Sequence, residues 1–203
     1  MRPCTDCHNP NSDHDPDLRI HLEKVACQTC HIPEFARAVS TDMFRDYRAV
    51  ELNARGLYEP AITRGSNVIP AYAFWNGQNG FYNFGDPASP GQAMAWPMGG
   101  INDGMLYPFK LHTAMLPQDP VTGAIIPAKA GILFQTGNMD LAIRTGAADA
   151  GFSLTKGYDF VNVVRWMGIY HEMPPASQAL TCAECHDATD RINFAELGYT
   201  PVE

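Results

Sequence analysis

One short motif occurs three times in this sequence and contains all six of its cysteines. Each copy has two cysteines separated by two residues and followed at once by a histidine. The copies are Cys4-Thr5-Asp6-Cys7-His8, Cys27-Gln28-Thr29-Cys30-His31 and Cys182-Ala183-Glu184-Cys185-His186. Two thiols at this spacing can form thioethers to the two vinyl groups of one haem, while the next imidazole reaches its iron. The motifs predict three covalently attached haem c groups, with His8, His31 and His186 as proximal iron ligands.

Zinc is the alternative for the first two motifs. Cys4, Cys7, Cys27 and Cys30 have the C-x2-C…C-x2-C spacing of a zinc ribbon. A zinc site does not require the histidine after each pair, and it leaves the third cysteine pair without thiol partners. Disulfides or a thioredoxin-type site do not explain the repeated histidine either. Haem attachment accounts for all three motifs.

Four further histidines are candidates for the sixth iron ligands. They are His14, His21, His112 and His171. His21 lies six residues before Cys27 and His171 eleven residues before Cys182, so attachment would hold both near a porphyrin. His14 lies between the first two motifs and either reaches an iron or faces solvent. Recruitment of His112 would fold the middle of the chain back onto a haem.

Methionine is the rival sixth ligand, and the chain has 9 of them, including Met173. A methionine ligand would raise the reduction potential of its haem relative to histidine. Because four histidines are available for three irons, we predict three bis-histidine, low-spin, low-potential haems. The surplus histidine is either an ordinary residue or a ligand to a haem of a neighbouring subunit.

Composition narrows the class of partner and the compartment. The net charge of −8, with only 14 Lys and Arg, argues against a nucleic-acid partner. No stretch approaches the roughly 18 consecutive apolar residues of a membrane span. Met1-Arg2-Pro3 leads directly into Cys4, so either a leader has been removed or the sequence begins inside a longer product. Covalent haem attachment predicts an extracytoplasmic location, periplasmic or extracellular.

The frequent glycines and prolines shape the expected fold. With 17 Gly and 16 Pro, we expect a mostly irregular structure with short α-helices and little β, organised around its haems. We treat residues 1–203 as a single domain with haem-bearing ends at 1–40 and 158–190 and a haem-free insert at about 41–157. Local patterns predict helices over 34–39, 139–144 and 158–171, a turn at 118–123, and a hairpin pairing 124–126 with 132–134. The helix over 158–171 would hold His171 rigidly.

Two segments carry a family resemblance. One is His21-Leu22-Glu23-Lys24-Val25-Ala26-Cys27-Gln28-Thr29-Cys30-His31-Ile32-Pro33, and the other runs from His171 to the third motif, with Leu197-Gly198-Tyr199 as a weaker similarity. They resemble the later part of the octahaem tetrathionate reductase family of multihaem cytochromes. The resemblance implies bis-histidine relay haems and supports His21 and His171 as axial ligands. Catalysis in that family depends on a haem with a lysine ligand, carried on additional motifs, whereas all three motifs here end in histidine.

These observations favour electron conduction over tetrathionate or nitrogen-oxide reduction. The few haems, the surplus histidine and the haem-free insert are also similar in organisation to the subunits of extracellular cytochrome filaments. We therefore predict an electron carrier that exchanges electrons with partner cytochromes and associates with itself. The alternative is a fragment or subunit of a multihaem reductase, in which one haem here lacks its sixth ligand and binds substrate.

Overall fold

The computed structural model describes residues 3–187 and 191–199. The strands are β1 (Thr41–Leu52), β2 (Tyr58–Gly65), β3 (Ala71–Trp75), β4 (Gln78–Phe81), β5 (Gln92–Met98), β6 (Met105–Gln118) and β7 (Asp159–Gly168). The α-helices are α1 (Pro10–Asp13), α2 (Cys27–His31), α3 (Ala130–Thr136), α4 (Met139–Asp149) and α5 (Cys182–His186). Short 3-10 helices are η1 (Cys4–Asp6), η2 (Pro16–His21) and η3 (Ala176–Gln178).

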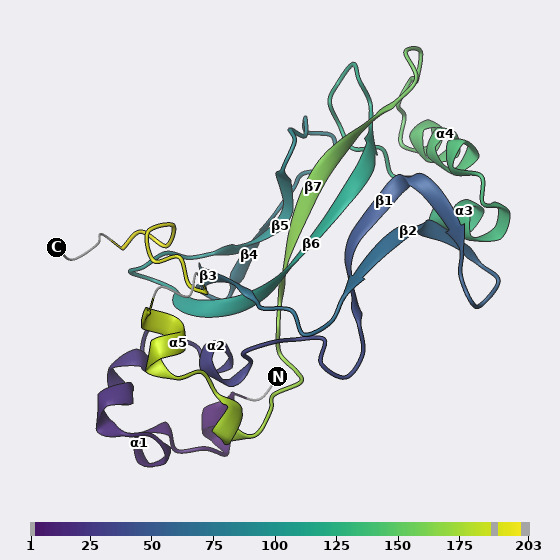
Figure 1. Ribbon diagram of the computed structural model, residues 1–203. Helices are drawn as coiled ribbons and strands as arrows, with labels where there is room; N and C mark the ends of the chain where they lie inside the picture. The colour runs from purple at the N-terminus through teal and green to yellow at the C-terminus, as the bar shows by residue number, and fades with distance from the viewer. Residues whose placement is uncertain (1–2, 188–190, 200–203) are drawn as a thin grey trace.

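A mixed seven-stranded sheet forms the body of the molecule, with strand order β2-β1-β6-β7-β5-β4 and with β3 paired to β6 (Figure 1). The β1–β6 and β5–β7 pairs are parallel, and the other pairs are antiparallel. The expectation of a mostly irregular chain with little β is therefore wrong. Glycine and proline mark turns between strands here and do not prevent strands, and Pro108 and Pro117 lie within β6 itself.

The segment predicted as a helix over 158–171 is strand β7 instead. Val161 and Val163 are both buried and alternate with more exposed residues, which is the two-residue period of a strand. The run is also rich in β-branched and aromatic side chains, which favour a pleated surface. The valines at steps of two and three are compatible with the period of a helix and with that of a strand. Pairing with β6 over ten residues makes the segment a strand.

Two other local predictions are wrong and two are confirmed. Residues 34–39 form no helix, because Ala36 has a left-handed φ of 58° and Phe35 pairs with Val68 instead. The predicted hairpin does not form either, since residues 132–134 lie in helix α3. The turn at 118–123 is present, with Asp119 accepting the backbone N–H of Val121. Helix α4 begins after Asn138 as predicted and extends further, to Asp149.

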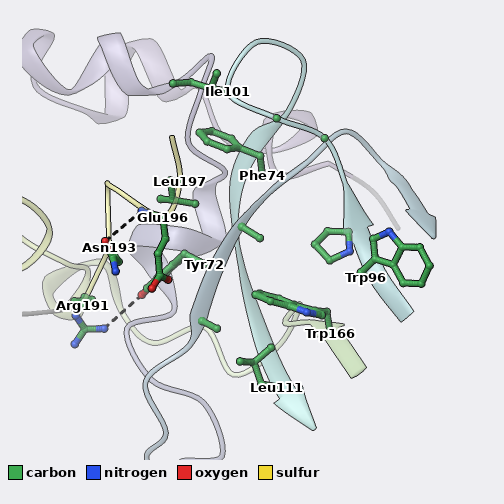
Figure 2. A pocket seen from close by; sticks show the side chains of 15 residues that line it. Tyr72, Phe74, Trp96, Ile101, Leu111, Trp166, Arg191, Asn193, Glu196 and Leu197 are labelled. Carbon is green, nitrogen blue, oxygen red and sulfur yellow. Dashed lines mark hydrogen bonds between the residues drawn. The ribbon is translucent and has the colours of Figure 1, made fainter. Parts of the chain in front are cut away.

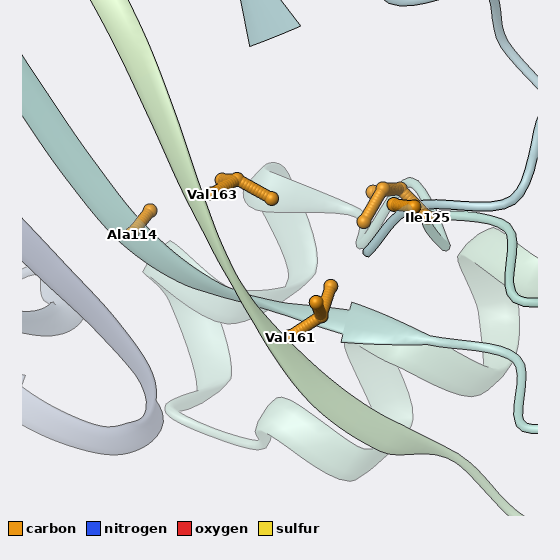
Figure 3. Close-up of a cluster of buried hydrophobic side chains, with 5 residues drawn as sticks. Ala114, Ile125, Val161 and Val163 are labelled. Carbon is orange, nitrogen blue, oxygen red and sulfur yellow. The ribbon is translucent and has the colours of Figure 1, made fainter. Parts of the chain in front are cut away.

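Protein side chains alone fill the core of the sheet. Figure 3 shows one cluster, in which Val161 and Val163 of β7 pack with Ala114 of β6 and with Ile125. A second cluster places Ile143 of α4 against Ile126, and both are fully buried. These contacts involve no residue of a cysteine motif. The sheet therefore has its own hydrophobic core.

The three cysteine motifs gather at one end of the sheet, although about 150 residues separate the second from the third (Figure 1). We call residues 3–31 and 182–187 the haem-bearing end and residues 41–168 the sheet region. Helices α3 and α4 lie at the opposite side, next to β1 and β2. Strand β7 thus belongs to the sheet region and leads back to the third motif. Among the described residues, no helix is long and apolar enough to span a bilayer.

Candidate haem centres

Helices α2 and α5 each contain a whole cysteine motif, and each places its two cysteines and its histidine on one side of the helix. In α2 and α5 the cysteines are three residues apart and the histidine follows, so all three lie within about one helical turn. Helix α5 is started by a capping box in which Thr181 and Glu184 satisfy each other's backbone N–H groups. This cap stabilises a helix of only five residues, which is too short to be stable from backbone hydrogen bonds alone.

Helix α2 is attached to the sheet through the backbone of Leu106 in β6. The Leu106 carbonyl accepts hydrogen bonds from the Ala26 N–H at 3.0 Å and from the Thr29 hydroxyl at 2.7 Å. Thr29, between the two cysteines, is only 1% exposed. The second motif is therefore fixed by the sheet, and the other two motifs pack around it.

The second motif lies between the first and the third. Burial, and then the Cys4 thiol, raises the pKa of Cys27, which agrees with the first motif lying next to the second. The Leu180 N–H donates to the Cys30 carbonyl at 2.9 Å and holds the start of α5 against α2. Burial raises the pKa of Cys30 to about 11, and Cys185 is the largest of the charged neighbours that add to the rise. Both other motifs are therefore neighbours of the second.

Two pairs of histidine rings lie close together, one pair edge-on at an interplanar angle of 76° and the other tilted at 45°, and each pair contains one motif histidine. The ring centroids of His14 and His31 are 5.9 Å apart, and those of His21 and His186 are also 5.9 Å apart. Metal–nitrogen bonds of about 2 Å on opposite sides of one metal ion place two imidazole centroids about 6 Å apart. Both pairs therefore fit axial ligation of one iron each.

The environment of these rings also suits metal ligation. The Nδ1 of His14 donates to the Pro10 carbonyl at 3.0 Å, so Nε2 is the ring nitrogen available to a metal. Burial, followed by the charges of His14 and His8, lowers the pKa of His31 and favours the neutral ring that ligation needs. His186 stacks on Phe194 with ring centroids 5.5 Å apart.

Comparison with known proteins agrees with this geometry. A family model described as bacterial cytochrome c matches residues 59–189, more than half of the chain. The chain belongs to this family. The crystal structure of an octahaem cytochrome c from Shewanella oneidensis matches with a TM-score of 0.83 and 30% sequence identity. The match covers 98% of this chain and 51% of that one, so the chain spans about half the length of the octahaem protein. No curated protein sequence matches.

The predicted resemblance to the octahaem family is thereby confirmed, and the protein is a multihaem c-type cytochrome with haem c as its cofactor. The family match includes most of the sheet region, from β2 to α5. The family match therefore includes both most of the sheet and the third motif.

The remaining motif histidine, His8, has no comparable ring partner among the seven histidines, all of which are described. Its Nδ1 is 4.0 Å from Asp13, and the side chain is 76% exposed. His171, predicted as an axial ligand, is also exposed and follows β7 by three residues. The Tyr107 hydroxyl donates to the carbonyl of Ile169 at 3.1 Å. The rings of Tyr107 and Tyr170 are 5.7 Å apart, so the segment just before His171 packs on Tyr107 of β6. Burial, followed by the charges of Tyr170, Cys4 and Cys27, raises the pKa of Tyr107.

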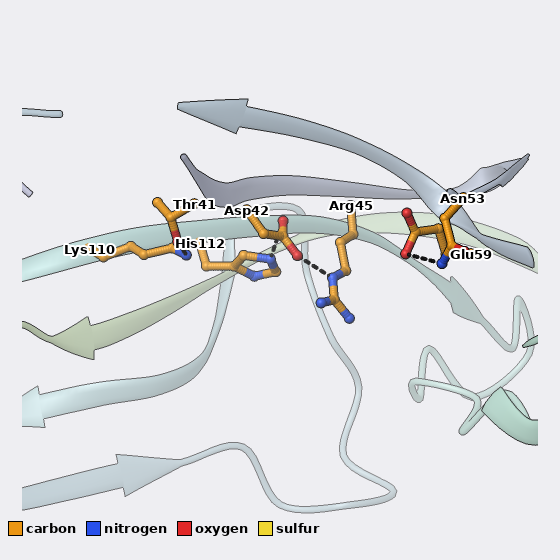
Figure 4. Close-up of polar contacts among 7 residues, drawn as sticks. All are labelled: Thr41, Asp42, Arg45, Asn53, Glu59, Lys110 and His112. Carbon is orange, nitrogen blue, oxygen red and sulfur yellow. Dashed lines mark hydrogen bonds and ion pairs between the residues drawn. The ribbon is translucent and has the colours of Figure 1, made fainter. Parts of the chain in front are cut away.

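His112, the fourth predicted ligand, lies in β6 and contacts none of the other histidine rings. It is 6% exposed, and its Nε2 is 3.1 Å from the Asp42 carboxylate of β1 (Figure 4). Arg45 binds the second oxygen of Asp42 at 2.5 Å. Burial lowers the pKa of His112 despite the nearby carboxylate, so the ring is held in its neutral form.

The sequence did not predict which residues of the sheet and of the segment 191–197 lie together near the motifs. A groove of about 800 Å³ lies beside the sheet, and Tyr72, Trp96, Trp166, Arg191 and Glu196 are among its lining residues (Figure 2). Arg191 follows the third motif by five residues, and this short separation is the only sequence signal for its position. Asp42 is 70 residues from His112 and gave no such signal.

Proposed function

We propose that this cytochrome is the electron-relay portion of a multihaem reductase of the octahaem type, with three haem c groups that pass electrons one at a time. The observation that carries the proposal is the pairing of His14 with His31 and of His21 with His186 at 5.9 Å. Support for a reductase comes from the resemblance to the octahaem tetrathionate reductase family and from the match to half of an octahaem cytochrome. A relay of bis-histidine haems would deliver electrons to a substrate-binding haem elsewhere in the assembly.

The chain's residues divide into three sets that would hold the three haems. Cys27 and Cys30 would bind the second haem between His31 and His14, and Cys182 and Cys185 the third between His186 and His21. Cys4 and Cys7 would bind the first haem with His8 on one side. Haem c supplies a one-electron Fe(III)/Fe(II) couple, and histidine ligands keep its potential lower than methionine would.

The second haem is the centre of the proposed relay. The Cys4 thiol adds to the raised pKa of Cys27, and the Cys30 carbonyl accepts the N–H of Leu180, two residues before the third motif. Electrons would therefore pass between the first and third haems through the second. The sheet supports this route because it fixes α2 through Leu106.

His171 is the residue that we assign to the sixth position of the first haem. His14 and His21 already face motif histidines, and His112 is bound to Asp42. Tyr107 contacts Ile169 and Tyr170 in the segment before His171, and the Cys4 thiol adds to the raised pKa of Tyr107. If His171 instead ligates a haem of a neighbouring subunit, it would mediate the predicted self-association.

One observation favours a second candidate function, in which the first haem binds substrate. His8 has no facing histidine ring at the 5.9 Å separation of the other two pairs. An iron with an open sixth position there would be high-spin when oxidised and would accept small ligands. The chain would then contain a reductase centre as well as two relay haems.

Electron paramagnetic resonance of the oxidised, fully haem-loaded protein separates these functions. The relay predicts three low-spin bis-histidine signals in the parent and one high-spin signal in His171→Ala. His112→Gln is the matched control and should keep all three low-spin signals. A high-spin signal in the parent that shifts on adding cyanide or nitrite would favour the substrate-binding haem. A methionine–iron charge-transfer band would contradict both assignments.

Location and partners complete the proposal. Members of the bacterial cytochrome c family are typically extracytoplasmic. We place this chain there too, exchanging electrons with other cytochromes.

A further inference from the structure

Arg191 lies where the second motif, the third motif and the sheet meet. Its Nη1 donates to the Pro33 carbonyl at 2.7 Å, two residues after His31. The same Nη1 lies 3.5 Å from the Tyr72 hydroxyl of β3 (Figure 2). The guanidinium is partly buried. One cation thus bridges the end of α2, the sheet and the segment that follows α5.

Sequence position also places Arg191 close to the second and third motifs. Pro33, whose carbonyl Arg191 binds, follows His31 by two residues, and Arg191 itself follows His186 by five. Burial raises the pKa of Tyr72 and Arg191 opposes that rise, which agrees with the contact between them. The cation is therefore near an attachment point of each of the two haems.

We propose that Arg191 is the positioning residue that sets the potentials of the second and third haems, and this rests on the proposed function. A bis-histidine ferric haem iron carries one more positive charge than the ferrous form, so a nearby cation stabilises the ferrous state and raises the potential. Both described hydrogen bonds of Arg191 use Nη1, so Nε and Nη2 retain donors for a haem carboxylate.

Spectroelectrochemical titration of Arg191→Gln tests the proposal. At a fixed applied potential, we expect the Fe(II)/Fe(III) ratio of two haems to fall about tenfold, from a Coulomb interaction over about 12 Å at an effective dielectric constant of about 20. For a one-electron couple this is a shift of about 59 mV. The first haem should change by less than about threefold.

Arg37→Gln is the matched control, because it removes the same charge from an exposed arginine near the third motif, where Arg37 binds Gln178. Arg191→Lys keeps the charge and should keep the ratio of both haems within about threefold of the parent. If Arg191→Gln does not fold, a lysine variant that folds and still shows the full tenfold loss would overturn the charge-based account.

Unchanged potentials in Arg191→Gln, or equal shifts in all three haems or in Arg37→Gln, would also overturn this inference. Haem content and the three low-spin signals should match the parent in every variant. If the parent protein itself lacks three low-spin signals, the proposed function is wrong. If the parent has them but the potentials do not respond to Arg191→Gln, only the inference about Arg191 is wrong.

Discussion

The haem-bearing end and the sheet region are built in opposite ways. The sheet buries Phe109, Ile126 and Ile143 to 2% exposure or less among other protein side chains. In the haem-bearing end, η1, α1, η2 and α5 bury no residue at all, α2 buries only Thr29, and Ile20 is 77% exposed. Helices of three to six residues without a core are not stable in isolation. The comparison teaches that the sheet can fold on protein contacts, whereas we expect η1, α1 and η2, which bury no residue, to depend on the haems for a core.

Blocking haem attachment should give the largest effect and separate the two regions. When all six motif cysteines are changed to serine, we expect the sheet to remain folded and the haem-bearing end to unfold. Amide hydrogen exchange should show protection at least about 100-fold lower in residues 3–21, which include η1, α1 and η2, than in β6 and β7. Equal protection in both regions would show that the haem-bearing end folds without its cofactor.

Substituting one histidine in each region should change different properties. His21→Ala removes a ring that faces His186 and should convert one low-spin haem to high spin, with little change in the stability of the sheet. His112→Ala leaves the haem spectrum unchanged but lowers the free energy of unfolding by about 1–3 kcal/mol, because Asp42 loses a buried partner. Absorption spectra and urea denaturation measure the two effects. A spectral change in His112→Ala would make it an iron ligand after all.

The cap of α4 gives a smaller effect that is confined to the sheet region. The Asn138 side chain accepts the Leu141 N–H at 2.9 Å, and Asn138→Ala should cost about 1 kcal/mol of stability. Haem potentials should be unchanged, because α4 packs at the side of the sheet away from the motifs. Asn138→Asp, which retains a capping oxygen, should lose less. A shift in any haem potential would indicate that the two regions are coupled.

The pH dependence of the sheet should show the smallest effect. Burial lowers the pKa of His112 below its ordinary value of 6.5, so the unfolded chain binds this proton more readily than the folded one. The neutral His112 ring makes its full contribution to the free energy of unfolding above pH 6.5. This contribution is lost as the pH falls from 6.5 through the lower pKa of the folded protein. Denaturation midpoints measured from pH 7.5 to pH 5 should show this decrease. The decrease should be smaller in His112→Gln, and an identical slope in both proteins would contradict the assignment.

The two regions also differ in how far the sequence alone predicts them. The motifs can be recognised in the sequence because thioether chemistry requires a fixed local spacing, and the Asn138 cap is likewise a local signal. The sheet depends on long-range pairing, such as β1 with β6, which no local window contains. The same limit hid Asp42 as the partner of His112 and Arg191 as a neighbour of the second motif. Strand β7 was misassigned because its spacing of apolar residues satisfies two periods at once.

Denaturing mass spectrometry of the mature protein tests the central claim most directly, because thioether-bound haem survives unfolding. The account predicts a mass that exceeds the polypeptide by three haem groups. Digestion should then locate one haem on each peptide that contains a cysteine motif. A mass equal to the bare polypeptide, or a motif peptide without haem, would contradict it.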